Sequence, residues 1–540
     1  MEERVKVVVL GIDGGSWNLI KEHVESGVLK NFKKLVDNGV HGYLKSSIPP
    51  STLPAWKCYS TGLKPRNISA FYWYMFDAAR KKVRIAGAEL QKHKEIWDYL
   101  GERGLVSVVL NMPTLYPPKK INGAIVSGFP AQDSKEYTYP KQLKRELVEK
   151  LQYRINPSGT LRVNIRKREE LERKYRVVKE IYELIKLRFE AAKYLWEKYR
   201  PDFMHLTVFY TDSLHHYMLN NEQEMEMLAE AWKILDEKLG EFLEFLGEEK
   251  LLFFVMSDHG MEKLRGTFYV NNYLHEKGYL KLKKSGLPAR LLGKLGLSLG
   301  LVYRLAKKKP FSLLVKLAPP SAIVRAWFFL RRSPKETSLV ELVDSVDWQR
   351  TKAVAIGDYA IYVNAPWGSE EHERIRSELI EELKSVKDPE HGESPFKKLY
   401  RGEELYDEDD CRRWGLSIVF QWRDGYLVQP AFHVEGRVWS YESEDGYSGF
   451  HAENGMFVAY GFNVKKGARI DAEIYDLAPT VLYAMGLEDV AEKLDGKVLR
   501  EIFLDPEAFK GGRVRRTVES EKERIRRRVK MLRLNRVERN

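Results

Sequence analysis

The feature that most constrains the fold is an apolar run that ends beside a carboxylate and an imidazole. Residues Phe253–Met256 lead through Ser257 into the adjacent pair Asp258 and His259, and Gly260 follows at once. A short apolar run of this kind predicts a buried strand, and the glycine marks its end. Ligands of open α/β sheets bind at the carboxyl ends of the strands. Asp258 and His259 are therefore candidate metal ligands, and an ordinary polar turn is the alternative interpretation.

Two more candidate ligand sets follow strand-like segments. The β-branched run Val5–Ile12 ends in Asp13, so we predict a central strand with this carboxylate at its carboxyl end. An aspartate that caps the next helix is the alternative. The strand-like run 203–210 leads to Asp212 and His216, four residues apart. In a helical turn this spacing places both side chains on one face, where they suit zinc or manganese.

The segment around Thr52 contains a candidate nucleophile. Pro49 and Pro50 force an extended approach, and Thr52 and Pro54 then suit a tight turn that opens a helix. The positive end of that helix would stabilise a hydroxyl that becomes an anion. A plain threonine cap is the commoner role of such a residue.

One further histidine lies close to a predicted strand. His451 stands in a predicted loop just before the strand 456–460, and His433 competes with it from a segment that resembles a lid strand. We therefore prefer His451 as the last candidate metal ligand.

Composition indicates a large globular protein that meets anionic partners. The chain has 540 residues, of which 44% are hydrophobic, and a formal net charge of +13. This charge favours phosphorylated ligands, nucleic acid or an acidic membrane surface. The sequence shows no signal-peptide core and no apolar stretch near the roughly 20 residues of a spanning helix, so a cytoplasmic location is expected. It also lacks a P-loop and a strand-linked GxGxxG, so we expect no nucleotide cofactor.

The predicted organisation is a core interrupted by a basic segment. The core comprises residues 1–282 and 336–510, with a basic amphipathic insert at 283–335 and a basic tail at 511–540. The insert contains no acidic residue, and its apolar clusters alternate with Lys and Arg. This pattern predicts peripheral association with an anionic membrane, and packing on the core or on a second subunit is the alternative. Residues about 393–445 look irregular, and we predict a lid over the site.

Taken in order, these residues resemble the alkaline phosphatase superfamily, most closely its type I phosphodiesterase/nucleotide pyrophosphatase branch and related phosphohydrolases or phosphomutases. The resemblance spans roughly residues 5–505 and is thinnest after Lys283. It implies an α/β/α sandwich with a mostly parallel central sheet. The motifs that carry it are Ile12-Asp13-Gly14, Ser51-Thr52-Leu53-Pro54 with Thr61-Gly62, Asp212 with His216, Ser257-Asp258-His259-Gly260-Met261, and His451.

The resemblance also implies two divalent metal ions, with zinc expected and manganese as the alternative. Thr52 would attack phosphorus to form a phosphothreonine, which water then hydrolyses. One ion would be held by Asp13, Thr52, Asp258 and His259, and the other by Asp212, His216 and His451.

The chain departs from the diesterase pattern in two places. Ala55-Trp56 stand where that pattern usually has Asn-His, and Asn67-Ile68-Ser69 replace the His-Gly pair expected after Pro65. These changes leave the phosphate-contacting donor open, and Asn111 and Lys57 are the candidates for it.

Several functions stay open at this point. A phosphodiester is the favoured substrate, because no arginine beside Thr52 in the sequence offers a guanidinium for the extra charge of a monoester. A phosphomutase or phosphomonoesterase on the same metal site is the enzymatic alternative. A basic membrane- or nucleic-acid-binding protein with a retired core is the non-enzymatic one. Expected partners are a small-molecule or lipid-linked phosphoester and, as a further candidate, a second copy of the chain.

Overall fold

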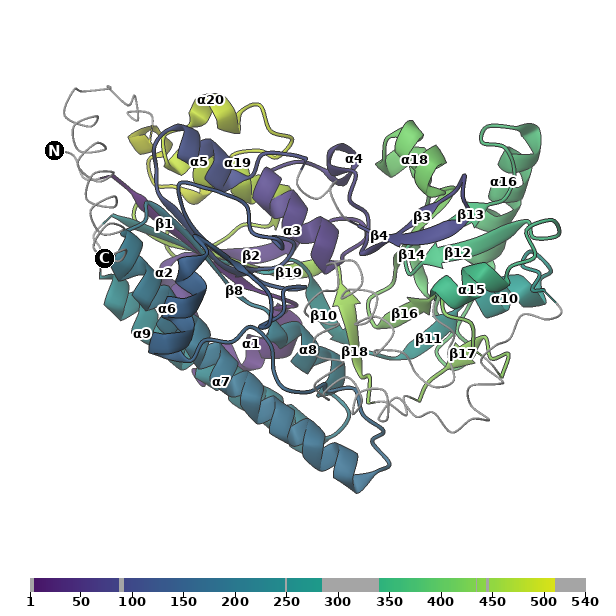
Figure 1. Ribbon diagram of the computed structural model, residues 1–540, viewed down its shortest axis with the longest axis horizontal. Coiled ribbons are helices and arrows are strands. Elements are labelled where there is room, and N and C mark those ends of the chain that lie inside the picture. Colours follow the sequence, from purple (N-terminus) through teal and green to yellow (C-terminus); the bar gives the residue numbers. More distant parts are fainter. Residues whose placement is uncertain are drawn as a thin grey trace.

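A ten-stranded, mostly parallel sheet forms the centre of the larger lobe (Figure 1). The computed structural model describes residues 4–86, 92–247, 250–283, 339–433, 435–442 and 446–509. The order along the sheet is β20-β2-β19-β9-β1-β8-β5-β6-β7, with β21 paired to β2. Three of these strands have two residues each: β7 (Thr138–Tyr139), β20 (Ala468–Arg469) and β21 (Ala472–Glu473). Its main strands are β1 (Lys6–Ile12), β2 (Val40–Lys45), β5 (Ser107–Met112), β6 (Gly123–Ser127), β8 (Phe203–Val208), β9 (Leu251–Met256) and β19 (Asn454–Gly461).

Strand β1 lies at the middle of this sheet and is buried on both faces. It pairs in parallel with β8 on one side and with β9 on the other. Its side chains alternate between two apolar clusters: Val8 and Leu10 pack into one, and Val7 and Val9 into the other. Burial on both faces is what a nearly continuous β-branched run predicts. The predicted central strand is therefore confirmed.

Helices cover both faces of the sheet (Figure 1). One apolar cluster includes residues of α1 (Trp17–Glu25), α2 (Lys30–Asn38), α6 (Gln142–Leu151), α7 (Arg168–Tyr199) and α9 (Glu222–Leu246). The opposite cluster includes residues of α3 (Thr52–Thr61), α5 (Ile96–Glu102), α19 (Leu477–Ala484) and α20 (Glu488–Ala491). This is the α/β/α sandwich with a mostly parallel sheet that the sequence predicted.

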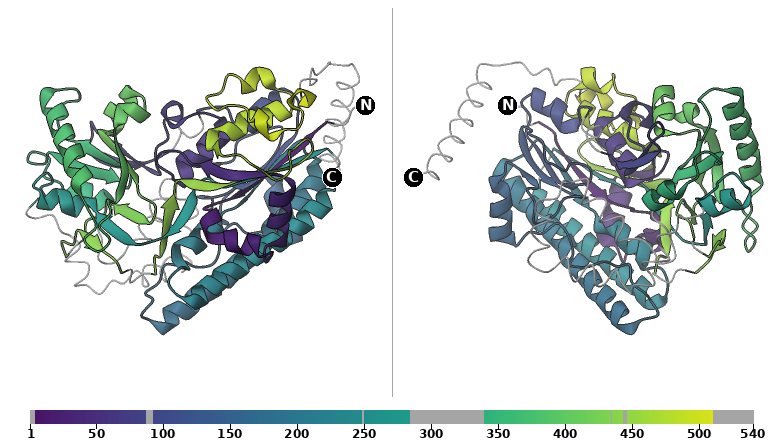
Figure 2. Two further views of the ribbon diagram at one scale, coloured as in Figure 1. Left: turned by 180° about the vertical axis from the view of Figure 1, so that it is seen from behind. Right: turned by 45° about the vertical axis from the view of Figure 1, so that its right-hand side comes forward.

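A smaller second lobe stands beside the first (Figures 1 and 2). It has its own apolar cluster, which includes Phe76, Phe268, Ile361 and Phe420. Its four-stranded sheet has the order β12-β13-β15-β14, and a three-stranded sheet has the order β16-β11-β17. Its elements are β3 (Tyr74–Asp77), β4 (Lys82–Ile85), β11 (Gly266–Tyr269), α10 (Val270–Glu276), α15 (Leu339–Ser345), β12 (Ala353–Gly357), β13 (Ala360–Val363), α16 (Glu370–Ser385), β14 (Phe396–Arg401), α18 (Glu408–Trp414), β15 (Ile418–Trp422), β16 (Tyr426–Gln429) and β17 (Trp439–Ser440).

The second lobe corrects one prediction. Residues 393–445 look irregular in the sequence, yet their described part forms β14 to β17 and α18, which pack into the second lobe's apolar cluster. The strands there are only two to six residues long, so their alternation is weak in the sequence. The role of this segment as a lid stays a prediction.

The basic segments fall almost entirely outside the described residues. Of the predicted insert 283–335 the structure describes Lys283 alone, and it describes none of the tail 511–540. Their predicted boundaries and their association with an anionic membrane stay predictions. Within the described ranges, we find no helix of the length and apolar character needed to cross a bilayer.

A buried ion pair supports helix α8 (Tyr210–Tyr217), which follows β8. The Lys174 ammonium on α7 donates to Glu224 Oε1 on α9 at 2.5 Å and to the backbone oxygen of Tyr217 at 2.6 Å. Lys174 and Glu224 are 0% and 1% exposed. The pair therefore ties the last turn of α8 to the two long helices behind it.

Removing one member of this pair should be costly. We expect Lys174→Ala to lower the free energy of unfolding by about 3–5 kcal/mol, because Glu224 is left as an unpaired buried charge. The control is Lys186→Ala on the same helix, whose partner Glu183 is exposed, and it should change stability by less than about 0.5 kcal/mol. Urea unfolding measures both. Equal values for the two variants would contradict this account of the pair.

Candidate functional site

Six candidate metal-ligand side chains meet where the carboxyl ends of three adjacent strands lie. Strands β8, β1 and β9 are neighbours and run in parallel, so the residues that follow them come together at one edge of the sheet. The side chain after β1 is Asp13, those after β9 are Asp258 and His259, and those of α8 are Asp212 and His216; His451 joins them from another element.

His451 reaches the site from a short strand. It lies in β18 (Gly449–Ala452), which pairs antiparallel with β10 (Gly260–Lys263) and places His451 opposite Met261. Figure 1 shows these two strands between the lobes. The prediction of a loop at His451 is therefore wrong, because four residues give too little alternation to reveal a strand. The competitor His433 belongs to neither ligand group in the described structure.

The ligand atoms form two groups that share one residue. The atoms of Asp13, Asp258 and His259 lie within 4.8 Å of one another, and so do those of Asp212, His259 and His451. His216 completes the second group, since its Nε2 is 3.1 Å from both Asp212 Oδ1 and His451 Nε2. His259 therefore stands between the two groups. Its ring stacks on that of His451 with centroids 3.6 Å apart.

Backbone carbonyls fix the tautomer of each imidazole. His216 Nδ1 donates to the oxygen of Gly449 at 2.7 Å, His259 Nδ1 to that of Gly260 at 3.0 Å, and His451 Nδ1 to that of Pro50 at 3.0 Å. A carbonyl oxygen only accepts, so each Nδ1 carries the hydrogen. In the neutral ring, Nε2 then has a free lone pair directed at the site.

In Asp13 and Asp258, one carboxylate oxygen accepts a hydrogen bond and the other faces the site. Asp13 Oδ2 accepts a hydrogen bond from Trp56 Nε1 at 3.0 Å, and Asp258 Oδ1 accepts one from the backbone N–H of Gly14 at 3.1 Å. Among the described residues, the other oxygens, Asp13 Oδ1 and Asp258 Oδ2, are buried without a hydrogen-bond partner, and so is Asp212 Oδ1. Buried carboxylate oxygens without a donor are unfavourable unless a cation lies among them.

Acceptor atoms therefore face acceptor atoms at short range. The Nε2 lone pair of His216 lies 3.1 Å from Asp212 Oδ1, and that of His259 lies 3.2 Å from Asp258 Oδ2. Such contacts repel unless a positive charge lies between the atoms. Carboxylate oxygens and neutral imidazole nitrogens are ligands of zinc and manganese, so the donor set fits divalent cations.

The electrostatics of Asp13 and Asp258 point the same way, and Asp212 differs from them. Burial, and then the charges of Asp258 and Asp212, raise the pKa of Asp13 well above its usual value. Burial also raises the pKa of Asp258 well above its usual value, and Asp212 adds to it. For Asp212, burial raises the pKa, but His216 and His451 outweigh it and hold the pKa well below the usual value. Without a cation, the site thus disfavours the ionised forms of Asp13 and Asp258.

Thr52 stands beside these ligands at the start of a helix. It is the first residue of α3, is 8% exposed, and its Oγ1 lies 3.4 Å from His259 Nε2. The preceding Ser51 is extended, and Pro54 occupies the first turn, where its missing N–H costs no hydrogen bond. The hydroxyl therefore lies at the positive end of α3.

The two candidate phosphate donors are occupied elsewhere. Lys57 is 2% exposed, and its ammonium donates to the buried Glu95 at 2.7 Å. Asn111 is 1% exposed, and its Nδ2 donates to the backbone oxygen of Thr207 at 3.0 Å. The structure therefore gives no support to a phosphate contact from Lys57 or from the amide nitrogen of Asn111. The sequence could not show this, because it does not reveal the buried partner of either side chain.

Sequence reasoning missed the contribution of Trp56. The sequence shows it only as a departure from the diesterase pattern, but the structure places its indole N–H on Asp13. A signal was present, since Trp56 follows Thr52 by four residues and one helical turn places both on one face.

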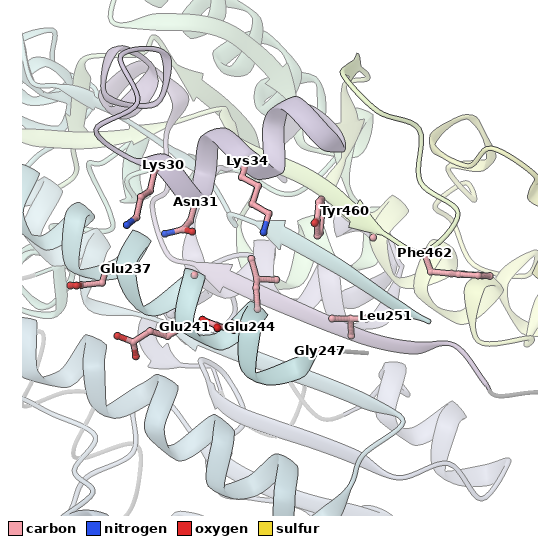
Figure 3. A pocket seen from close by; sticks show the side chains of 13 residues that line it. Lys30, Asn31, Lys34, Glu237, Glu241, Glu244, Gly247, Leu251, Tyr460 and Phe462 are labelled. Atoms are coloured by element: carbon pink, nitrogen blue, oxygen red, sulfur yellow. The ribbon is translucent and has the colours of Figure 1, made fainter. Parts of the chain in front are cut away.

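A cavity of about 770 Å³ lies away from this site, at the amino ends of the strands. Figure 3 shows the side chains that line it. It opens beside Leu251, the first residue of β9, whereas Asp258 follows the last, roughly 20 Å further along the strand. Its lining includes Lys30 and Lys34 together with Glu237 and Glu241, so its charges oppose one another. In the described part of the chain, neither metal-ligand group lies there.

Comparison with known proteins agrees with this geometry. The model of the type I phosphodiesterase/nucleotide pyrophosphatase family matches residues 7–314, more than half of the chain. The chain belongs to this family. Membership of this family favours a hydrolase that acts on phosphoester bonds over the non-enzymatic alternative.

Individual relatives are distant. An ectonucleotide pyrophosphatase/phosphodiesterase of Caenorhabditis elegans is 36% identical over 88 residues, which are 16% of this chain and 10% of that protein. Phosphonoacetate hydrolase from Sinorhizobium meliloti 1021, solved with phosphonoformate, is 16% identical with a TM-score of 0.54 and covers 90% of this chain and 96% of its own. This likeness supports the fold. Human ectonucleotide pyrophosphatase/phosphodiesterase 5 is 14% identical with a TM-score of 0.44 and covers 89% and 94%.

Replacing one site carboxylate should change stability in opposite directions with and without metal. We expect Asp258→Asn to raise the melting temperature of metal-free protein, because the raised pKa makes ionised Asp258 a cost that grows as the pH rises above about 4. The parent should gain about 2.7 kcal/mol at a free zinc or manganese concentration 100-fold above Kd, and the variant should lose most of this gain.

Calorimetry at pH 7.5 with and without metal measures both effects. Asp37→Asn, an exposed carboxylate on α2, is the control and should shift neither temperature. A variant at Asp258 that is destabilised without metal and still responds fully to metal would contradict the electrostatic argument.

Proposed function

We propose that the chain hydrolyses small-molecule phosphodiesters with Thr52 as the nucleophile and two divalent cations, zinc or manganese, as cofactors. The observation that carries this proposal is the set of buried carboxylate oxygens without a hydrogen-bond partner among the described residues, grouped with imidazole nitrogens beside the Thr52 hydroxyl. The ordered motifs of the family support it.

Each residue has a role in this proposal. Asp13, Asp258 and His259, with the Thr52 oxygen, would hold one cation, and Asp212, His216 and His451 the other. When bound, the cations lower the pKa of the Thr52 hydroxyl and offset charge on the phosphoryl and leaving oxygens.

The chain's own groups carry the two transfer steps. The deprotonated Thr52 oxygen bonds to phosphorus while the bond from phosphorus to the leaving oxygen breaks, which gives a phosphodiester between Thr52 and the retained ester group. The leaving oxygen takes up a proton, which balances the one lost by the Thr52 hydroxyl, and departs as an alcohol. Water then bonds to phosphorus and releases Thr52 and a phosphate monoester. The N-terminal end of α3 favours the anionic oxygen before attack.

The charge of the site favours a diester over a monoester. Among the described residues, no ion pair joins an arginine or lysine to Asp13, Asp212 or Asp258. A monoester carries one more negative charge, for which enzymes commonly supply a guanidinium. A diester therefore suits the described charge balance better.

Substitution of the nucleophile tests its role. Thr52→Ala should keep the fold and both metals but lose turnover by on the order of 10³-fold or more, because the attacking oxygen is gone. Thr52→Ser should retain measurable turnover, since it lacks only a methyl group. Metal content and single-turnover kinetics measure these outcomes. Parent-like turnover in Thr52→Ala would show that water attacks phosphorus directly.

The substrate class is tested with matched chromogenic esters. We expect bis-p-nitrophenyl phosphate to have a higher kcat/KM than p-nitrophenyl phosphate, and chelation of zinc and manganese to abolish both activities. The two esters share a leaving group, so the ratio reports the charge preference. A much higher kcat/KM for the monoester would instead favour a phosphomonoesterase or a phosphomutase.

A further inference from the structure

Trp56 contacts one oxygen of the Asp13 carboxylate, Oδ2, whereas the contact of Asp13 with His259 is through Oδ1. Its indole Nε1 donates to Asp13 Oδ2 at 3.0 Å, and both side chains are 0% exposed. Trp56 lies one turn after Thr52 on α3, so the helix that carries the candidate nucleophile also contacts a candidate metal ligand.

Gly11 makes this contact sterically possible. Gly11 and Asp13 are two residues apart at the end of β1, so both face the side on which the indole lies. A Cβ atom on Gly11 would meet Trp56 Cη2 at 2.4 Å and Cζ3 at 3.0 Å. The indole therefore lies directly over the strand backbone at Gly11, and its N–H reaches Asp13.

Neighbouring rings hold the indole in this orientation. Tyr59 and His205 pack edge-on against Trp56, with centroids 5.9 Å and 5.6 Å away and interplanar angles of 82°. These two residues are themselves linked, because the Tyr59 hydroxyl and His205 Nδ1 are 2.9 Å apart. His205 Nε2 is in turn 2.7 Å from Thr207 Oγ1. The indole plane is thus fixed by a packed, hydrogen-bonded set and by the strand.

A carboxylate with one oxygen held has little freedom left for the other. Trp56 occupies Asp13 Oδ2, and Asp13 Oδ1 is the buried oxygen without a hydrogen-bond partner in the group with Asp258 and His259. Because the two oxygens are rigidly connected, fixing Oδ2 sets the direction of Oδ1. Hydrogen bonds behind metal ligands orient those ligands in this way.

We propose that Trp56 is a positioning residue that directs Asp13 Oδ1 at the cation bound by Asp13, Asp258 and His259. This inference rests on the proposed metal-dependent function and adds to it a residue outside the ligand set. It assigns the effect to one N–H group and not to the volume of the indole.

A matched pair of tryptophan substitutions separates these two contributions. Trp56→Phe removes the N–H while keeping an aromatic ring. Trp97 on α5 is also fully buried, but its Nε1 has no hydrogen-bond partner in the described part of the chain, so Trp97→Phe removes an indole N–H that contacts no described acceptor. Both variants lose similar volume, and only Trp56→Phe loses a contact to a metal ligand.

The readout is metal affinity, measured by chelator competition on metal-free full-length protein with zinc and with manganese. We expect the parent to bind two ions. Trp56→Phe should weaken one of the two binding steps by about 10–100-fold and leave the other unchanged. Trp97→Phe should leave both steps unchanged, with melting temperatures of the metal-free variants as the check on folding.

Gly11→Ala provides a second variant that keeps the tryptophan. The added methyl would displace the indole, so the same binding step should weaken. In the Trp56→Phe background the same alanine should cost less, because phenylalanine lacks the Cη2 atom that the methyl meets. The variant with both substitutions should therefore lose less metal affinity than the sum of the losses in the two single variants.

The outcomes separate this inference from the function on which it rests. A parent that binds no zinc or manganese would overturn the metal-dependent function and this inference with it. A parent that binds two ions, with Trp56→Phe equal to Trp97→Phe in both affinities, would overturn the inference alone. If Trp56→Phe fails to fold, an unchanged affinity in Gly11→Ala overturns the inference, and a weakened single step supports it.

Discussion

The structure depends on the burial of three carboxylates among neutral imidazoles at the end of a parallel sheet. Asp13, Asp212 and Asp258 each present an oxygen without a donor, and the histidines present lone pairs, because backbone carbonyls already use their Nδ1 hydrogens. Such an arrangement is unfavourable as an apo site and favourable around cations. The side chains that make the metal-free site unfavourable are the same ones that we expect to take part in phosphoester hydrolysis.

Well-packed strands and one helix hold the residues of this site in position. Strands β8, β1 and β9 are buried on both faces, so the residues at their carboxyl ends are held by a well-packed sheet. Helix α3 adds the Thr52 hydroxyl and, one turn later, the Trp56 indole. The second lobe contributes as well, since Trp422 Nε1 donates to the backbone oxygen of His451 at 2.9 Å. Both lobes therefore hold the ligand set.

The candidate ligands other than His451 were predictable because they come after an apolar run at a strand end. Asp13 and the Asp258-His259 pair stand out in this way, and the Asp212-to-His216 spacing predicted the helical turn that α8 provides. The strand at His451 and those of residues 393–445 were not predicted, since short strands give little alternation. Lys57 was a candidate phosphate donor in the sequence because nothing there reveals its buried partner Glu95, which is distant along the chain.

The sequence by itself determined where the core strands lie along the chain and which residue types are available for metal chemistry, because local hydrophobic periodicity and strand-end punctuation encode them. Its resemblance to a known family implied the fold class. Only the tertiary structure decided which oxygens stay unpaired, that His259 stands between two ligand groups, and that Trp56 holds Asp13 across the gap left by Gly11. These are relations between segments up to hundreds of residues apart. Pairing distant groups requires knowledge of packing, which no local pattern contains.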